Sequence, residues 1–193
     1  MGKIIEQGTF YAYSQLRLDE AKLPISEYSY FFKKTTVFVS HKHDELQELK
    51  GVLGFLQNQY GVKTYIDSQD STMPIFTSEE TARILKDRIK RCDKFILLAT
   101  NAAIESKWCN WELGYGDAQK YKKHIALLPI KPHGSLDSSY KGAEYLLIYP
   151  YICYEDGTGK DDFGKNIPRG YYVEKTENGK HYYQTLSSWF LET

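Results

Sequence analysis

The chain of 193 residues lacks the marks of a secreted or membrane protein. It has three cysteines, Cys92, Cys109 and Cys153, and no C-x-x-C pair, so the sequence predicts neither a disulfide framework nor a zinc site. Free thiols fit a reducing cytoplasm best. The segment Met1 to Tyr13 lacks the basic-then-apolar order of a signal peptide, and no apolar run approaches the roughly 20 residues of a membrane span. We therefore expect a cytoplasmic protein with no membrane partner.

An excess of one charge is also absent. Lys and Arg together number 25, as do Asp and Glu, so the formal net charge is zero. Proteins that bind nucleic acids or membrane surfaces nonspecifically usually carry a basic excess. The balanced charge therefore predicts no nucleic-acid partner.

The usual phosphate-binding loops are missing too. No G-x-x-x-x-G-K-[ST] motif occurs, and Gly114-Tyr115-Gly116 lacks a third glycine and falls inside a predicted helix. A phospho-receiver domain would need paired acids after its first strand and an Asp after its third. This chain has Ser40-His41 and Thr100 at those places, so we exclude that class.

From Thr35 onward, strand patterns alternate with helix patterns. Continuous apolar runs predict buried strands at 35–39, 62–66, 94–99, 124–130 and 145–149. Helical spacing of apolar residues predicts helices at 44–60, 78–91 and 108–121, with loops at 67–77 and 100–107. Such alternation is typical of the α/β class, an open parallel five-stranded sheet with helices on both faces.

The two ends of the chain differ from this middle part. We divide the chain into an extension at 1–34 that packs on the domain, a domain at 35–150, and a tyrosine-rich extension at 151–193. In the first extension, Asp19 to Lys22 could form a short helix that Pro24 would end.

In the last extension, a turn sequence separates two strand-forming runs. Asn178-Gly179 lies between Tyr171–Val173 and His181–Tyr183, which predicts a β-hairpin. Leu186, Trp189 and Phe190 predict a closing helical turn. The many tyrosines, 17 in all, are best explained as rings that pack on a sheet.

Ligands of open parallel sheets bind beyond the carboxyl ends of the strands. Three polar segments follow strands there, namely 40–44, 67–77 and 100–107, and the third leads into a helix that starts near Trp108.

The residues around these ends resemble three motifs of TIR (Toll/interleukin-1 receptor) domains of bacterial type. Thr36–His41 resembles the first strand with its closing Ser, Tyr65-Ile66-Asp67 the second strand with its closing Asp, and Ser106–Leu113 the S-x-W-C-x-x-E-L signature. The resemblance covers roughly 35–150 and implies a flavodoxin-like sheet. The segment Ser68–Thr77 departs from the Gly-rich pattern often found there.

The resemblance implies one of two kinds of function. Some TIR domains are adaptor modules, whereas others cleave the nicotinamide–ribose bond of NAD⁺ to give nicotinamide and ADP-ribose or a cyclic isomer, often as an antiphage-defence signal. The enzymes need the carboxylate that Glu112 matches, so we favour an NAD⁺ glycohydrolase or cyclase that uses NAD⁺ as its substrate and no cofactor. The resemblance further implies self-association for activity, and we hypothesise a separate effector protein that senses the product.

A single carboxylate suffices for this chemistry. Nicotinamide leaves as a neutral molecule, and a carboxylate beside the ribose stabilises the oxocarbenium-like cation left behind. Trp108 lies four residues before Glu112, on the same helix face, where its ring could stack on nicotinamide or adenine. Core packing explains Trp108 equally well, and most helical glutamates are simply exposed acids.

The strand-one loop and Asp67 complete the predicted substrate site. Ser40, His41 and Lys42 could contact ribose or phosphates, although Lys42 could equally be a solvated loop residue. Asp67 has a structural alternative, the capping of backbone N–H groups. His41-x-His43 lacks an evident third ligand, so we expect no metal, and Cys109 should be a buried small residue. A non-enzymatic TIR adaptor and a nucleoside-type N-ribosyl hydrolase or transferase remain the alternative functions.

Overall fold

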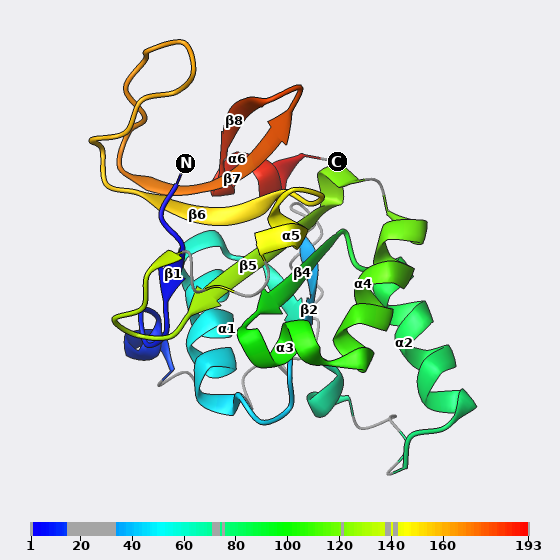
Figure 1. Cartoon of the computed structure of the whole chain (residues 1–193). Helices are drawn as coiled ribbons and strands as arrows, with labels where there is room; N and C mark the ends of the chain where they lie inside the picture. The colour runs from blue at the N-terminus through cyan, green and yellow to red at the C-terminus, as the bar shows by residue number, and fades with distance from the viewer. Residues whose placement is uncertain are drawn as a thin grey trace.

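The computed structural model describes residues 2–14, 34–70, 74, 76–120, 122–137, 140 and 143–192. Five parallel strands form its centre, in the order β3-β2-β4-β5-β6 (Figure 1). They are β2 (Thr36–Ser40), β3 (Lys63–Tyr65), β4 (Lys94–Ala99), β5 (Ile125–Lys131) and β6 (Tyr151–Glu155). The predicted five-stranded parallel sheet is therefore confirmed.

Two local predictions were wrong. The fifth strand is not at 145–149: α5 (Ala143–Leu146) ends within that range, and β6 begins only after Pro150. Leu147 and Ile148 are 80% and 52% exposed, so an apolar run that resembles a buried strand lies at the surface. The predicted loop at 100–107 contains α3 (Asn101–Glu105), because the Thr100 hydroxyl accepts a hydrogen bond from the N–H of Ala103 and caps the helix.

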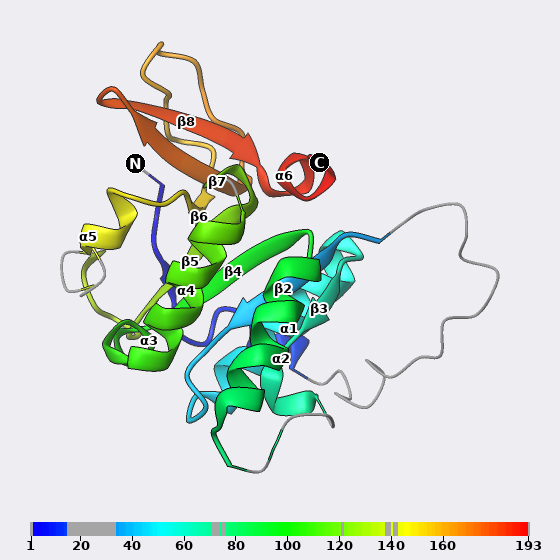
Figure 2. The same cartoon turned by 90° about the vertical axis from the view of Figure 1, so that its right-hand side faces the viewer.

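Three longer helices cover the two faces of the sheet. They are α1 (Leu46–Tyr60), α2 (Glu79–Arg91) and α4 (Lys107–Gln119), as predicted to within a few residues. Figures 1 and 2 show α1 on one face and α2 and α4 on the other. Alternation along β2 explains the two layers, since Val37 and Val39 pack with α1 and Phe38 packs on the opposite side.

The sequence also marks the ends of these helices. Gly61 ends α1 in the left-handed conformation, with φ of 63°. Ser78 begins α2 in a capping box, in which its side chain and that of Thr81 each accept a hydrogen bond from the other residue's backbone N–H.

The N-terminal segment completes the core beside α1. Its strand β1 (Ile5–Glu6) pairs in parallel with β5, and η1 (Tyr11–Tyr13) lies against α1. Phe10 is fully buried and stacks on Phe55, with ring centroids 4.3 Å apart. Gly51 allows this contact, because a Cβ there would lie 2.7 Å from the Phe10 carbonyl oxygen. The helix predicted from Asp19 to Lys22 lies outside the described residues.

The predicted hairpin is confirmed and extends the same sheet. It consists of β7 (Gly170–Glu177) and β8 (Lys180–Thr185), and β7 pairs antiparallel with β6. Asn178 and Gly179 have φ of 53° and 73°, as a type I′ turn requires. The closing helix α6 (Leu186–Leu191) follows β8, with its Trp189 in the core. Each helix in the described part of the chain is too short or too polar to cross a membrane.

Candidate active site

Glu112 lies on the inner face of α4, where the helix packs against the carboxyl end of β2. Its side chain is only 2% exposed, and its Oε2 accepts a hydrogen bond of 2.5 Å from the Ser40 hydroxyl. Burial raises the pKa of Glu112 to about 8, the hydrogen bond from Ser40 opposes this rise, and the negative charge of Asp67 adds to it. The neutral form of the carboxyl group is therefore the favoured one at pH 7.

A cavity of about 530 Å³ opens next to this pair. Four of the predicted substrate-binding residues line it, namely His41, Lys42, Asp67 and Trp108. Its other described lining residues are His43, Ser68, Asp70, Pro74, Thr77, Thr81, Ser106 and Cys109. Ser40 and Glu112 are adjacent to the cavity but are not among its lining residues. The structure therefore brings all six predicted site residues together in two layers, an open one and a buried one.

Asp67 is the central charged group of the open layer. Its Oδ1 accepts a hydrogen bond from the N–H of Ser68 at 2.8 Å, which is the capping role considered as its structural alternative. Its carboxylate also faces two imidazoles, with Oδ2 at 3.4 Å from Nε2 of His43 and Oδ1 at 3.9 Å from Nδ1 of His41. Capping and substrate contact are thus compatible at this residue.

His41 is buried between this carboxylate and the backbone of its own strand. Burial holds the pKa of His41 below its ordinary value, although the charge of Asp67 opposes this effect. Its ring stacks on that of His43, with centroids 5.4 Å apart. Among the described residues, no group of three His, Cys, Asp or Glu side chains is arranged to hold a metal ion. His41 and His43 are therefore best explained as part of the polar cavity wall.

Cys109 is buried, as the sequence predicts. Its thiol donates a weak hydrogen bond to the His41 carbonyl oxygen at 3.4 Å, and burial raises its pKa. A thiol of this kind is a poor nucleophile. We therefore assign it to packing beneath the cavity rather than to catalysis.

Trp108 is the first ring of an aromatic stack along α4, which the sequence analysis did not predict. Trp111 lies 5.0 Å from Trp108 and Tyr115 lies 6.1 Å from Trp111, measured between ring centroids in nearly parallel planes. The ammonium of Lys86 on α2 lies 5.8 Å and 5.7 Å from the Trp111 and Tyr115 rings. The i, i+3, i+7 spacing along α4 was the available signal. The stack therefore holds the Trp108 indole in position in the cavity wall.

Comparison with known proteins identifies the family to which this site belongs. The sequence model of the TIR domain family matches residues 37–162, which is 126 of the 193 residues. The chain belongs to the TIR domain family. The resemblance carried by Thr36–His41, Tyr65-Ile66-Asp67 and Ser106–Leu113 is thereby confirmed, together with the flavodoxin-like fold that it implies.

One relative is a bacterial protein. This TIR protein is 34% identical over 119 residues to a probable 3′ cyclic ADP-D-ribose synthase, ThsB′, from Bacillus cereus (strain MSX-D12). The match covers 61% of this chain and 60% of the relative, so the chain spans less than two thirds of the relative's length.

Proposed function

We propose that this TIR protein cleaves the nicotinamide–ribose bond of NAD⁺ and releases nicotinamide. The second product is either ADP-ribose or a cyclic ADP-ribose isomer, and we favour the cyclic isomer. One observation carries the proposal: Glu112, held by Ser40, lies buried beside a cavity whose wall includes the indole of Trp108. The relative named as a 3′ cyclic ADP-D-ribose synthase supports a cyclic product.

The first half of the reaction needs a negative charge next to the ribose. The C1′–N bond breaks, its electron pair passes to the nicotinamide nitrogen, and nicotinamide leaves as a neutral molecule. The remaining ribose carries an oxocarbenium charge, which the Glu112 carboxylate stabilises. Because the cationic substrate favours the ionised form of Glu112, binding of NAD⁺ itself lowers the cost of ionising this buried acid.

The second half decides the product. An oxygen nucleophile attacks C1′ and loses its proton, which an ionised carboxylate such as Glu112 can accept. If that oxygen belongs to water, the product is ADP-ribose. If it belongs to a hydroxyl of the same ADP-ribosyl group, the product is cyclic, and no water is consumed. A cavity that excludes water while it folds the dinucleotide back on itself favours the second outcome.

The open layer of the site provides the binding groups. Trp108 stacks on the nicotinamide or adenine ring, and Lys42, which is partly exposed at the cavity, contacts the pyrophosphate. Asp67 and His41 contact ribose hydroxyls. We assign no cofactor and no metal to this reaction.

The biological setting follows from the same proposal. The reaction runs in the cytoplasm as an antiphage-defence signal, self-association of the protein favours activity, and a separate effector protein senses the cyclic product. An adaptor without enzymatic activity would have no use for a buried acid beside a cavity of this size, which is why we favour the enzyme.

The test is product analysis by chromatography and mass spectrometry after incubation of concentrated protein with NAD⁺. The native protein and Glu112→Gln are compared, with nicotinamide riboside as a substrate that lacks the pyrophosphate. Release of nicotinamide from NAD⁺ by the native protein alone supports the proposal, and the mass of the second product separates cyclisation from hydrolysis. Equal turnover of NAD⁺ by the native protein and Glu112→Gln would contradict the proposal. Faster turnover of nicotinamide riboside than of NAD⁺ would favour the nucleoside-type hydrolase.

A further inference from the structure

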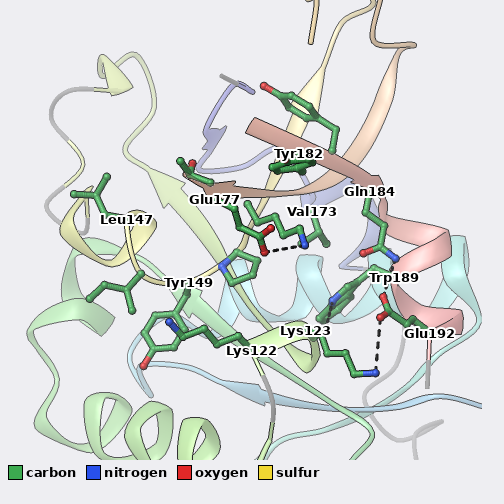
Figure 3. A pocket seen from close by; sticks show the side chains of 15 residues that line it. Lys122, Lys123, Leu147, Tyr149, Val173, Glu177, Tyr182, Gln184, Trp189 and Glu192 are labelled. Atoms are coloured by element: carbon green, nitrogen blue, oxygen red, sulfur yellow. Dashed lines mark hydrogen bonds and ion pairs between the residues drawn. The ribbon is translucent and has the colours of Figure 1, made fainter. Parts of the chain in front are cut away.

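A second cavity, of about 540 Å³, lies at the opposite end of the parallel strands (Figure 3). It is enclosed by η5 (Lys122–His124) before β5, by residues 147–150 after α5, and by the hairpin and α6. Since β4 has six residues at about 3.3 Å each, roughly 20 Å of sheet separates this end from the carboxyl end. The second cavity is therefore not an extension of the candidate active site.

Lysines dominate the rim of this cavity. Figure 3 shows Lys122 and Lys123 on one side, and Lys175 on β7 contributes a third ammonium. Two acids partly balance them, since Glu177 lies 3.0 Å from Lys175 and Glu192 lies 3.9 Å from Lys123. The lining thus carries one more positive charge than negative.

The residues beneath the rim add to this positive field. Lys94 is fully buried, and its Nζ lies 3.0 Å from Nδ1 of His124 and 4.8 Å from the centre of the Trp189 ring. Burial lowers the pKa of His124, and the charges of Lys94 and Lys123 lower it further. Glu192 already offsets part of this positive charge, since its carboxylate raises the pKa of both Lys94 and His124. A bound anion would offset more of it, because the only other described acid that lines the cavity is Glu177.

Large apolar side chains stand at the mouth of the same cavity. Leu147 is 80% exposed, Ile148 is 52% exposed and Tyr182 is 39% exposed, whereas Val173 and Trp189 form a buried floor. An exposed aromatic and aliphatic mouth next to lysines suits a molecule with a flat ring at one end and a phosphate at the other. The volume lies within the range of about 300–1,000 Å³ that is usual for small-molecule sites.

We propose that this cavity is a second, effector-type site that binds a nucleotide, with its base against Tyr182 and Ile148 and its phosphate on Lys122 and Lys123. The proposal does not depend on the reaction assigned to the first cavity, because it rests on different residues. It gives the hairpin and α6 a role, since most of the residues that line the cavity belong to the hairpin, to α6 or to the residue that follows α6. The ligand class is a phosphorylated nucleoside.

The test is calorimetric titration of the full chain with AMP, adenosine and inorganic phosphate as separate probes. We expect AMP to bind more tightly than either of its two parts. The double substitution Lys122→Gln/Lys123→Gln should weaken AMP binding about tenfold or more, as the loss of charge-assisted hydrogen bonds predicts. Tyr182→Ala should weaken AMP and adenosine binding but leave phosphate binding unchanged.

Lys42→Gln is the control for the other cavity, because it removes the lysine that lines that cavity. The proposal holds if AMP binding survives Lys42→Gln and falls in the double variant, and if AMP raises the pKa of His124 measured by NMR in the native protein. It is overturned if AMP does not bind saturably, if Lys42→Gln alone abolishes binding, or if AMP binds no more tightly than adenosine or phosphate alone. Equal melting temperatures of the variants show that they remain folded.

Discussion

The two ends of the central sheet carry buried ionisable groups of opposite sign. At the carboxyl end, Glu112 is 2% exposed and its pKa is raised to about 8, and at the amino end, Lys94 is 0% exposed and its pKa is lowered to about 8. Burial is the largest cause at both places and drives each group toward its neutral form. At pH 7 these pKa values leave Glu112 mostly neutral and Lys94 mostly protonated, and a ligand of opposite charge favours the ionised form of either group. The carboxyl end therefore suits a cationic group such as the nicotinamide–ribose part of NAD⁺, and the amino end suits an anion.

The largest effect should separate the two ends by activity. Glu112→Gln removes the charge that stabilises the oxocarbenium ion and should lower kcat for nicotinamide release about 100-fold or more. Lys94→Met keeps a similar shape at the other end and should leave kcat within about threefold, because no step of the reaction involves it. Release of nicotinamide is measured by chromatography at saturating NAD⁺, with circular dichroism to verify folding. A loss of kcat in Lys94→Met as large as that in Glu112→Gln would contradict the separation of the two ends.

The pH profile should reveal the buried acid of the carboxyl end. In the proposed reaction the ionised form of Glu112 is the active one. Because the pKa of Glu112 is about 8, kcat/KM should then rise with pH by about tenfold per unit below pH 8 and level off above it. Ser40→Ala removes the hydrogen bond that favours the carboxylate, so its profile should shift to higher pH. A flat profile between pH 6 and pH 9 would show that Glu112 is already ionised in the free protein.

A smaller effect tests the stack behind Trp108. Trp111→Leu removes the ring that supports Trp108 and should raise KM about fivefold with little change in kcat, since an aromatic pair contributes about 0.5–1.5 kcal/mol. Trp111→Phe should restore most of the affinity, and Tyr115→Leu, at the far end of the stack, should have the weaker effect. The quenching of tryptophan fluorescence by NAD⁺ gives an independent measure. An unchanged KM and unchanged quenching in Trp111→Leu would exclude this positioning role.

The sequence predicted the carboxyl end better than the amino end for a physical reason. Parallel strands bring their carboxyl ends to one edge, so the short motifs at Ser40 and Asp67 could be placed beside the helix of Glu112 without knowledge of side-chain contacts. The hydrogen bond between Ser40 and Glu112 joins residues 72 positions apart, and no local pattern predicts it. The burial of Glu112 was also missed, because its shared helix face with Trp108 suggested equal access to the ligand.

The amino-end cavity depends on packing that a local pattern does not contain. Lys122, Lys175 and Trp189 come from three separate segments, which meet because β7 pairs with β6. The wrong position predicted for the fifth strand also concealed this cavity. A strand at 145–149 would have buried Leu147 and Ile148 instead of placing them at the cavity mouth. The hairpin itself was predictable, because Asn178-Gly179 fixes its turn locally.

The smallest predicted effect is on stability, where the two ends should respond to pH in opposite directions. The folded-state pKa of Glu112 lies above its ordinary value of 4.5, so the folded protein binds the extra proton and loses stability as pH rises from about 4.5 to about 8. The folded-state pKa of Lys94 lies below 10.5, so the folded protein binds fewer protons and gains stability as pH rises from about 8 to about 10.5. Glu112→Gln should therefore stabilise the protein most above pH 8, and Lys94→Met should stabilise it most below pH 8. Urea denaturation at pH 6 and pH 9 measures both differences. If each variant changes the free energy of unfolding by the same amount at pH 6 as at pH 9, neither Glu112 nor Lys94 has a shifted pKa in the folded protein. The comparison between the two ends then fails.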